Sequence, residues 1–158
     1  MKIKELSIGD WVVAKLAKWD YDSLEETEPM RIVCIDNSEP KRAFADLTLD
    51  EVGITHSALV DDLLPIPLTP EVLEKNGFVK ITEDMVWAEH LNPKLAEIPT
   101  WGLKIGERPV PYLVAKMRDN NHFKITTTNI ELFGFNAGHV HQLQHVLRLA
   151  GIEKEIEL

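Results

Sequence analysis

Short apolar runs separated by polar segments dominate the first 68 residues. The runs contain side chains that favour strands, and they lie at 11–14, 31–36, 43–49 and 54–59. Gly9 and Asp10 precede the first run, and both residue types are typical of turns. The pattern therefore predicts four short strands about ten residues apart.

Strands of this length and spacing are typical of a small barrel or a strongly bent sheet. The segment at 8–12, Ile-Gly-Asp-Trp-Val, resembles the opening of many SH3-like barrels. We therefore expect an SH3-like β-barrel over residues 1–68. Residues 20–29 are largely polar and half of them are acidic, which predicts a solvated loop between the first two strands.

Two prolines mark the passage into the second half of the chain. The segment 64–68, Leu-Pro-Ile-Pro-Leu, cannot form a central strand because each proline removes a backbone donor, so it predicts an extended connector. Thr69 and Pro70 then form a helix start, with threonine as the N-cap and proline in the first turn. Asn76 and Gly77 predict the end of this short helix.

The second half, residues 69–158, predicts an α+β unit. We expect β structure at 78–87, an irregular stretch at 92–106, and a hairpin whose strands lie at 112–117 and 122–128. An apolar segment at 129–135 approaches the core. A last strand is expected at 153–158. The fold class is therefore α+β, with an antiparallel sheet in this half.

The clearest helical pattern spans residues 137–150. At about 100° per residue, one side of the helix is apolar: Val140, Leu143, Val146, Leu147 and Ala150. The other side is polar: His141, Gln144, His145 and Arg148. Gly151 occupies the position that favours a left-handed residue after a helix. We expect this amphipathic helix to pack on the sheet and to leave its polar side in solvent.

The formal charge of the 158-residue chain is −9, and it is unevenly distributed. Residues 1–68 hold 14 acidic and 7 basic side chains, a net −7, and residues 69–158 hold 12 and 10, a net −2. Binding to a phosphate backbone depends on clustered lysine and arginine, so this distribution argues against nucleic acid. It favours a basic protein partner instead.

Nothing in the sequence predicts a membrane protein or a secreted one. The chain lacks an apolar stretch long enough to span a bilayer, and its first residues lack the pattern of a secretory signal. We expect a cytoplasmic location. The one cysteine, Cys34, excludes an internal disulfide framework, and its apolar neighbours predict a buried small side chain.

No motif of a known catalytic or cofactor-binding site is present, so we assign no catalytic residues and no cofactor. There is no phosphate-binding glycine loop and no nucleophile elbow. His141 and His145 are four residues apart on the predicted helix and are the candidates for a metal site. Arg148, on the same side of the helix, opposes a bound cation, so a solvated polar surface is the competing interpretation.

Aromatic side chains give a second set of candidates. Trp19 beside the acidic loop, and Trp87 with His90 in the second half, are the residues that we single out for contact with a ligand or partner. The competing interpretation is that tryptophans fill the core. If the site near Trp87 and His90 lies between the two halves, the chain would be a small-ligand-binding protein or an enzyme.

Two segments carry a family resemblance. The segment 65–78, Pro-Ile-Pro-Leu-Thr-Pro-Glu-Val-Leu-Glu-Lys-Asn-Gly-Phe, is followed near the end by Val-His-Gln-Leu-Gln at 140–144 and Ala-Gly at 150–151. Their order and separation are similar to those of uncharacterised small proteins from phages, prophages and mobile elements of Bacteroides-type bacteria. That group usually has Asn at the position of His145 and an aromatic at that of His139. The resemblance implies a genomic setting and does not indicate which activity the protein has.

These observations favour a non-enzymatic protein-interaction module of a phage or mobile element. The acidic surface of the first half, or an exposed sheet edge, would bind the partner. The alternative is the ligand-binding protein or enzyme described above.

Overall fold

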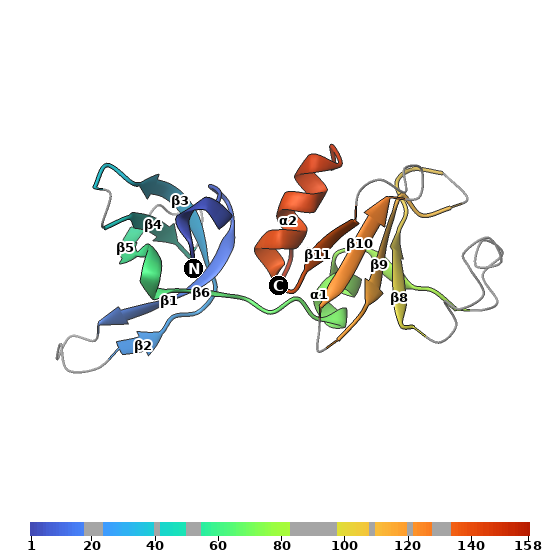
Figure 1. Cartoon of the computed structure of the whole chain (residues 1–158), viewed down its shortest axis with the longest axis horizontal. Coiled ribbons are helices and arrows are strands. Elements are labelled where there is room, and N and C mark those ends of the chain that lie inside the picture. The colour runs from blue at the N-terminus through green and yellow to red at the C-terminus, as the bar shows by residue number, and fades with distance from the viewer. Residues whose placement is uncertain are drawn as a thin grey trace. The chain divides into compact units, whose positions relative to one another are not determined.

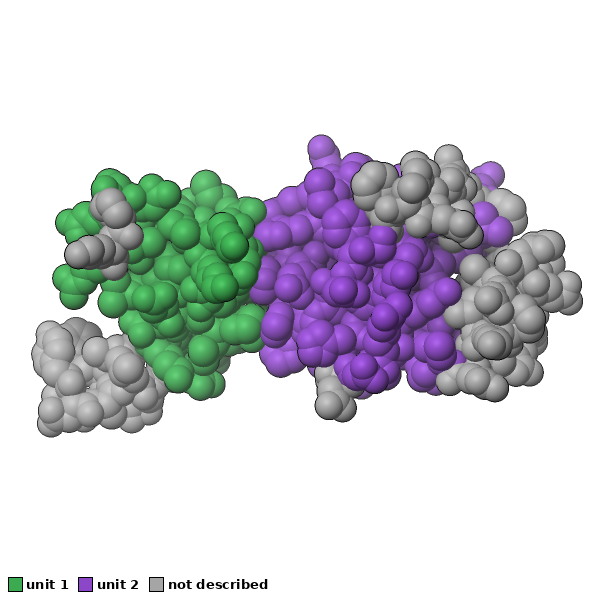
Figure 2. Space-filling model, in the orientation of Figure 1, with its two compact units in different colours: residues 1–66 green, residues 67–158 purple. Residues whose placement is uncertain are grey.

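The computed structural model of the chain describes residues 1–17, 24–39, 42–49, 55–82, 98–107, 110–119, 122–127 and 134–158. These residues form two compact units, unit 1 (Met1–Ile66) and unit 2 (Pro67–Leu158), coloured separately in Figure 2. The boundary that we predicted from the sequence lies after residue 68. The fold is α+β: over the described residues each unit is built on one antiparallel sheet, and the two α-helices described there belong to unit 2 (Figure 1).

Unit 1 contains six strands and two short 3₁₀ helices among the described residues. In chain order they are η1 (Ile3–Glu5), β1 (Trp11–Ala17), β2 (Leu24–Glu26), β3 (Met30–Asp36), β4 (Phe44–Thr48), β5 (Thr55–Leu59), η2 (Val60–Asp62) and β6 (Leu63–Pro65). The sheet has the order β2-β1-β3-β4-β5, and β6, outside this order, pairs antiparallel with residues 12–14 of β1. The predicted strands at 11–14, 31–36, 43–49 and 54–59 are thus confirmed as β1, β3, β4 and β5.

The sheet of unit 1 is open among the described residues, and the SH3-like barrel stays a prediction. Among the described residues β5 pairs only with β4, and β6 pairs only with β1, so these two strands form edges. Two predictions were wrong in detail. Residues 24–26, predicted as loop, form β2 through the hairpin with β1. Residues 63–65, at the start of the predicted connector, form β6, where Pro65 is tolerated because it lies at the strand's end and on an edge.

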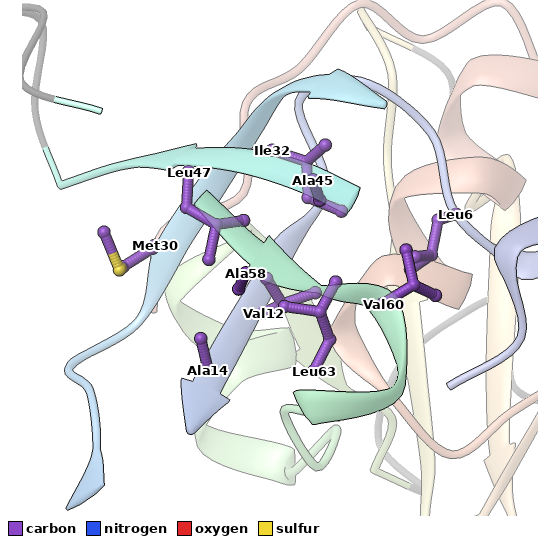
Figure 3. Packing of buried hydrophobic residues seen from close by; sticks show 10 residues of the cluster. All are labelled: Leu6, Val12, Ala14, Met30, Ile32, Ala45, Leu47, Ala58, Val60 and Leu63. Carbon is purple, nitrogen blue, oxygen red and sulfur yellow. The ribbon is translucent and has the colours of Figure 1, made fainter. Parts of the chain in front are cut away.

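The core of unit 1 is a single cluster of apolar side chains. Figure 3 shows ten of them converging from the strands, η2 and the chain before β1: Leu6, Val12, Ala14, Met30, Ile32, Ala45, Leu47, Ala58, Val60 and Leu63. The alternation of side chains along each strand explains this, because Ala45 and Leu47 point inward while their neighbours point outward. The inward face is thus the one that the sequence pattern selected.

Unit 2 contains a five-stranded sheet of order β11-β10-β9-β8-β7. Its elements are α1 (Pro70–Lys75), β7 (Phe78–Lys80), β8 (Thr100–Leu103), β9 (Leu113–Met117), β10 (Phe123–Thr127), β11 (Gly134–Ala137) and α2 (Val140–Leu149). The predicted hairpin is confirmed as β9 and β10, which pair antiparallel in register. Residues 100–103, predicted as irregular, form β8 between β7 and β9. All four residues of β8 are buried, and a strand buried on both faces does not alternate in sequence.

The two helices begin and end largely as their capping residues predict. The Thr69 hydroxyl accepts a hydrogen bond from the Val72 N–H, Pro70 is the first residue of α1, and Gly77 follows it with a φ of 78°. Gly151 follows α2 with a φ of 72°. The helix α2, beside β11 in Figure 1, begins at Val140 and not at 137, because residues 134–137 pair with β10 as a strand.

The last residues do not form the predicted strand. Residues 152–158 have no regular secondary structure, although Ile156 is buried. The backbone N–H and C=O of Glu157 bind the side chain of Asn76 at the end of α1. The side-chain amide of Asn76 therefore makes the hydrogen bonds to the Glu157 backbone that a neighbouring strand would make in a sheet.

None of the helices among the described residues is long and apolar enough to cross a membrane.

Candidate interaction surface

The outward face of the three-stranded meander β3–β4–β5 gathers polar, acidic and apolar side chains. In register, Asp36 lies opposite Phe44, and Cys34 lies opposite Asp46, which in turn lies opposite Ser57. We call this surface the β3–β5 outer face and define it by six residues: Val33, Cys34, Asp36, Phe44, Asp46 and Ser57. It is the side of the sheet opposite the core of unit 1.

An irregularity in β3 places two successive side chains in solvent. The register between β3 and β4 shifts between Ile32 and Cys34, as in a β-bulge, so Val33 is an extra residue without a cross-strand partner. Val33 is 40% exposed and Cys34 is also exposed, whereas Ile32 is fully buried. The prediction of a buried Cys34 was wrong. The alternation of side chains in the sequence does not reveal that Val33 is an extra residue in the strand.

The apolar side chain of Phe44 lies on the same outward face as two carboxylates. Phe44 is 37% exposed and is flanked by Asp36 on β3 and by Asp46, two positions along β4. An exposed aromatic ring beside negative charges suits the alkyl chain and charged end of lysine or arginine. The surface can thus offer both apolar contact and charge to one basic side chain.

Hydrogen bonds hold both carboxylates. The Asp36 carboxylate accepts the backbone N–H of Ser38 at 2.8 Å, and this bond, with a further one from the Ser38 side chain, lowers the pKa of Asp36. The carboxylate of Asp46 accepts a hydrogen bond from the Ser57 hydroxyl across the β4–β5 pair. Because hydrogen bonding to the charged form favours it, Asp36 stays ionised at neutral pH and below.

The edge strand β5 borders this surface. In the described chain β5 pairs only with β4, so its other side presents backbone N–H and C=O groups, as edge strands do. The exposed acidic residue Asp61 follows in η2. His56 does not complete a catalytic set with Ser57 and Asp46, since neighbouring residues of a strand point to opposite faces.

The predicted contact residues Trp19, Trp87 and His90 lie outside the described residues, so the alternative of a ligand-binding protein or enzyme stays a prediction. The other two tryptophans are described. Trp101 is buried in unit 2, where its indole N–H donates to the Glu74 carboxylate at 2.9 Å. Trp11 lies half-buried, with the Arg31 guanidinium 4.7 Å from its ring centroid. Trp101 and Trp11 thus both contact other side chains of this chain.

The candidate metal residues His141 and His145 lie on α2, in a row of three imidazole rings with His139, the residue before the helix. The rings of His139 and His141 stack with centroids 5.7 Å apart, and the rings of His141 and His145 meet edge-on at 5.9 Å. Over the described ranges, no three His, Cys, Asp or Glu side chains are grouped so that they could hold a metal ion. The three rings contact one another, and a metal at His141 and His145 stays a prediction.

The polar side of α2 is less exposed than we predicted. His141 is only 3% exposed and Gln144 is also buried, while His145 is half-buried and Arg148 is exposed. Helical periodicity shows which side of a helix a residue occupies and does not show what covers that side. Gln142 has a local role, since its side-chain oxygen accepts the N–H groups of Gly138 and His139 and caps the helix start.

The residues of the β3–β5 outer face were not among the predicted contacts, although part of the signal was present. In residues 43–49 the apolar side chains alternate, and Phe44 falls on the side occupied by Asp46 and Thr48. An aromatic on the polar side of an alternating strand indicates an exposed ring. The bulge that exposes Val33 and Cys34 has no such signal.

Comparison of the chain with protein-family models, with curated proteins and with solved structures finds no match.

Proposed function

We propose that this protein is a non-enzymatic interaction module that binds a basic, extended segment of a partner protein on the β3–β5 outer face. The observation that carries the proposal is the position of Phe44, which is exposed between Asp36 and Asp46 and one strand away from the edge β5. Apolar area, negative charge and strand backbone are thus available on one continuous surface.

The order of elements supports an SH3-like barrel as the fold of unit 1. The strands β3, β4 and β5 form a meander, the 3₁₀ turn η2 follows β5, and β6 then pairs with β1. Such an arrangement brings the end of the unit back to its first strand. Small barrels of this kind bind partner segments on their outer surfaces, so the fold and the proposed role agree.

Charge supports a basic partner over an acidic one. Residues 1–68 carry a net −7, and the described exposed acidic residues of unit 1 are distributed over several elements: Glu5, Glu26, Glu28, Asp36, Glu39 and Asp61. Complementary charge accelerates association and sets specificity, and its effect falls as salt screens it. An extended partner can in addition pair with the free side of β5.

A synthetic peptide tests the proposal directly. The probe is a ten-residue peptide with arginine at every second position and valine between, titrated into the full-length protein and followed by backbone amide NMR shifts. We expect saturable shifts in β3, β4 and β5, and a Kd that rises as salt is added. A matched peptide with glutamate in place of arginine should not bind.

Two variants and a control identify the surface. Phe44→Ser and the double change Asp36→Asn with Asp46→Asn should each weaken peptide binding, whereas Asp119→Asn, an exposed acid of unit 2, should not. Salt-independent binding, or shifts confined to unit 2, would overturn the proposal. All four substitutions lie at exposed or half-buried positions, so we expect the variants to fold and their binding to be measurable.

The resemblance to proteins of phages and mobile elements extends this proposal. Such proteins are encoded by elements carried in bacterial cells, and from this setting we propose a cytoplasmic location and a partner encoded by the same element or by its host. Detection of the protein in the soluble cytoplasmic fraction of its cell, with loss of the complex in the Phe44→Ser variant, tests both statements.

A further inference from the structure

The sheet of unit 2 has two faces of different character. One face is built from buried apolar side chains, and Trp101 on it bonds to Glu74 of α1. Strand register assigns the intervening residues to the second face. One row across that face runs through four strands in the order Thr100, Lys116, Lys124 and Asn136.

Two lysines are direct neighbours in this row. Lys116 on β9 and Lys124 on β10 are cross-strand partners, and like charges placed directly opposite destabilise a sheet. Both side chains are half-buried. In the described part of the chain neither lysine has a carboxylate partner, although the sequence holds 26 acidic residues against 17 basic ones. The row therefore concentrates positive charge in a protein whose net charge is negative.

The backbone around the pair leaves room for the lysine chains. Gly134 on β11 lies opposite Thr126, and a Cβ added there would come within 2.6 Å of the Lys124 Cε and 3.5 Å of its Nζ. The end of the Lys124 side chain thus lies over Gly134, which has no side chain of its own. Neutral hydrogen-bonding side chains adjoin the pair, with Asn136 on one side and Thr126 two residues along β10.

We propose that Lys116 and Lys124 form a binding site for a small, doubly charged oxyanion such as a phosphate group, free or carried on a larger molecule. Lysines at paired positions of β9 and β10 supply two positive charges for a doubly charged anion, and the side-chain amide of Asn136 can donate a further hydrogen bond. Burial lowers the pKa of Lys116, and the charge of Lys124 lowers it further. An anion bound by both lysines would offset these two effects on the pKa of Lys116, because a nearby negative charge favours the charged form of a lysine.

Inorganic phosphate is the probe for this site. The full-length protein is titrated with phosphate at constant ionic strength, with chloride as the balancing anion, and the lysine side-chain signals are followed by NMR. We expect saturable shifts for Lys116 and Lys124. Lys116→Met and Lys124→Met should each raise the Kd about tenfold or more, as expected for the loss of a charged hydrogen-bond donor.

Two further variants separate binding from folding. Lys80→Met removes an exposed lysine that lies opposite Trp101, on the other face of the same sheet, and should leave phosphate binding unchanged. Gly134→Ala should weaken binding by displacing the flexible end of Lys124 while the fold remains intact. A phosphate response no larger than that of chloride would overturn the proposal, as would equal binding by Lys116→Met. The lysine chains would then serve only to cover the buried Val114 beside them.

Discussion

The side chain of Asn76 and the backbone of Glu157 are joined by two reciprocal hydrogen bonds. The Asn76 amide donates to the Glu157 carbonyl at 2.8 Å, and the Asn76 carbonyl accepts the Glu157 N–H at 3.0 Å. The same amide also donates to the Val72 carbonyl in α1. One fully buried residue thus ends a helix and anchors the chain terminus 81 residues later.

We expect Asn76→Ala to lower the free energy of unfolding by about 2 kcal/mol or more, because it leaves the backbone N–H and C=O groups of Glu157 without their side-chain partners. Urea unfolding measures this change. The control is Asn136→Ala, an exposed asparagine of β11, which should change stability by less than about 0.5 kcal/mol. Equal effects of the two variants would show that the Asn76 bonds contribute nothing particular.

Two residues of β4 that face opposite sides of the sheet provide a second comparison of stability. Leu47 is fully buried in the core of unit 1 and Phe44 is on the outer face, so Leu47→Ala should cost about 2–5 kcal/mol. Phe44→Ala should cost much less, although phenylalanine is the larger side chain. Thermal or urea unfolding of the two variants checks the order. A reversed order would mean that the assigned inward and outward faces are wrong.

The start of α1 predicts a pH dependence. The Thr69 hydroxyl binds the Glu71 carboxylate and lowers the pKa of Glu71 below its usual 4.5. Because the folded pKa is lowered, the stabilisation is present above pH 4.5 and is lost as the pH falls through the folded value. Thr69→Ala should cost about 1 kcal/mol at pH 7 through the lost cap, and less at pH 3. Unfolding at the two pH values tests this.

A carbon NMR titration of Glu71 supplies the matching control. In Thr69→Ala its pKa should return toward 4.5, and Glu71→Gln should abolish the pH-dependent part of the difference. If the penalty for Thr69→Ala were the same at both pH values, the bond to Glu71 would not contribute.

The exposed position of Cys34 predicts a reactive thiol in the native protein. A disulfide reagent such as 5,5′-dithiobis(2-nitrobenzoate) should modify it without unfolding, at a rate close to that of the chain in denaturant. Access controls this rate together with the fraction of thiolate. Modification only under conditions that unfold the protein would contradict this prediction. It would show that Cys34 is buried, as the sequence pattern indicated.

The elements that sequence patterns predicted correctly are those with a local physical signal. Thr69, Pro70 and Gly77 bound α1 because a cap, a fixed φ and a positive φ each depend on the residue alone. The hairpin β9–β10 follows from two strand-forming runs around a short turn. The prediction for β8 failed because segments distant in the sequence bury both faces of this strand. The prediction for residues 153–158 failed because Glu157 binds the side chain of Asn76, which is also distant in the sequence.

The sequence by itself determined the α+β class, the acidic character of residues 1–68, both ends of α1 and the C-terminal end of α2. These properties depend on composition and on residues close together in the chain. Only the tertiary structure decided that Cys34 and Phe44 face outward, that His141 is buried, and that Lys116 lies beside Lys124. Each of these depends on strand register or on packing, which bring together residues that no local pattern connects.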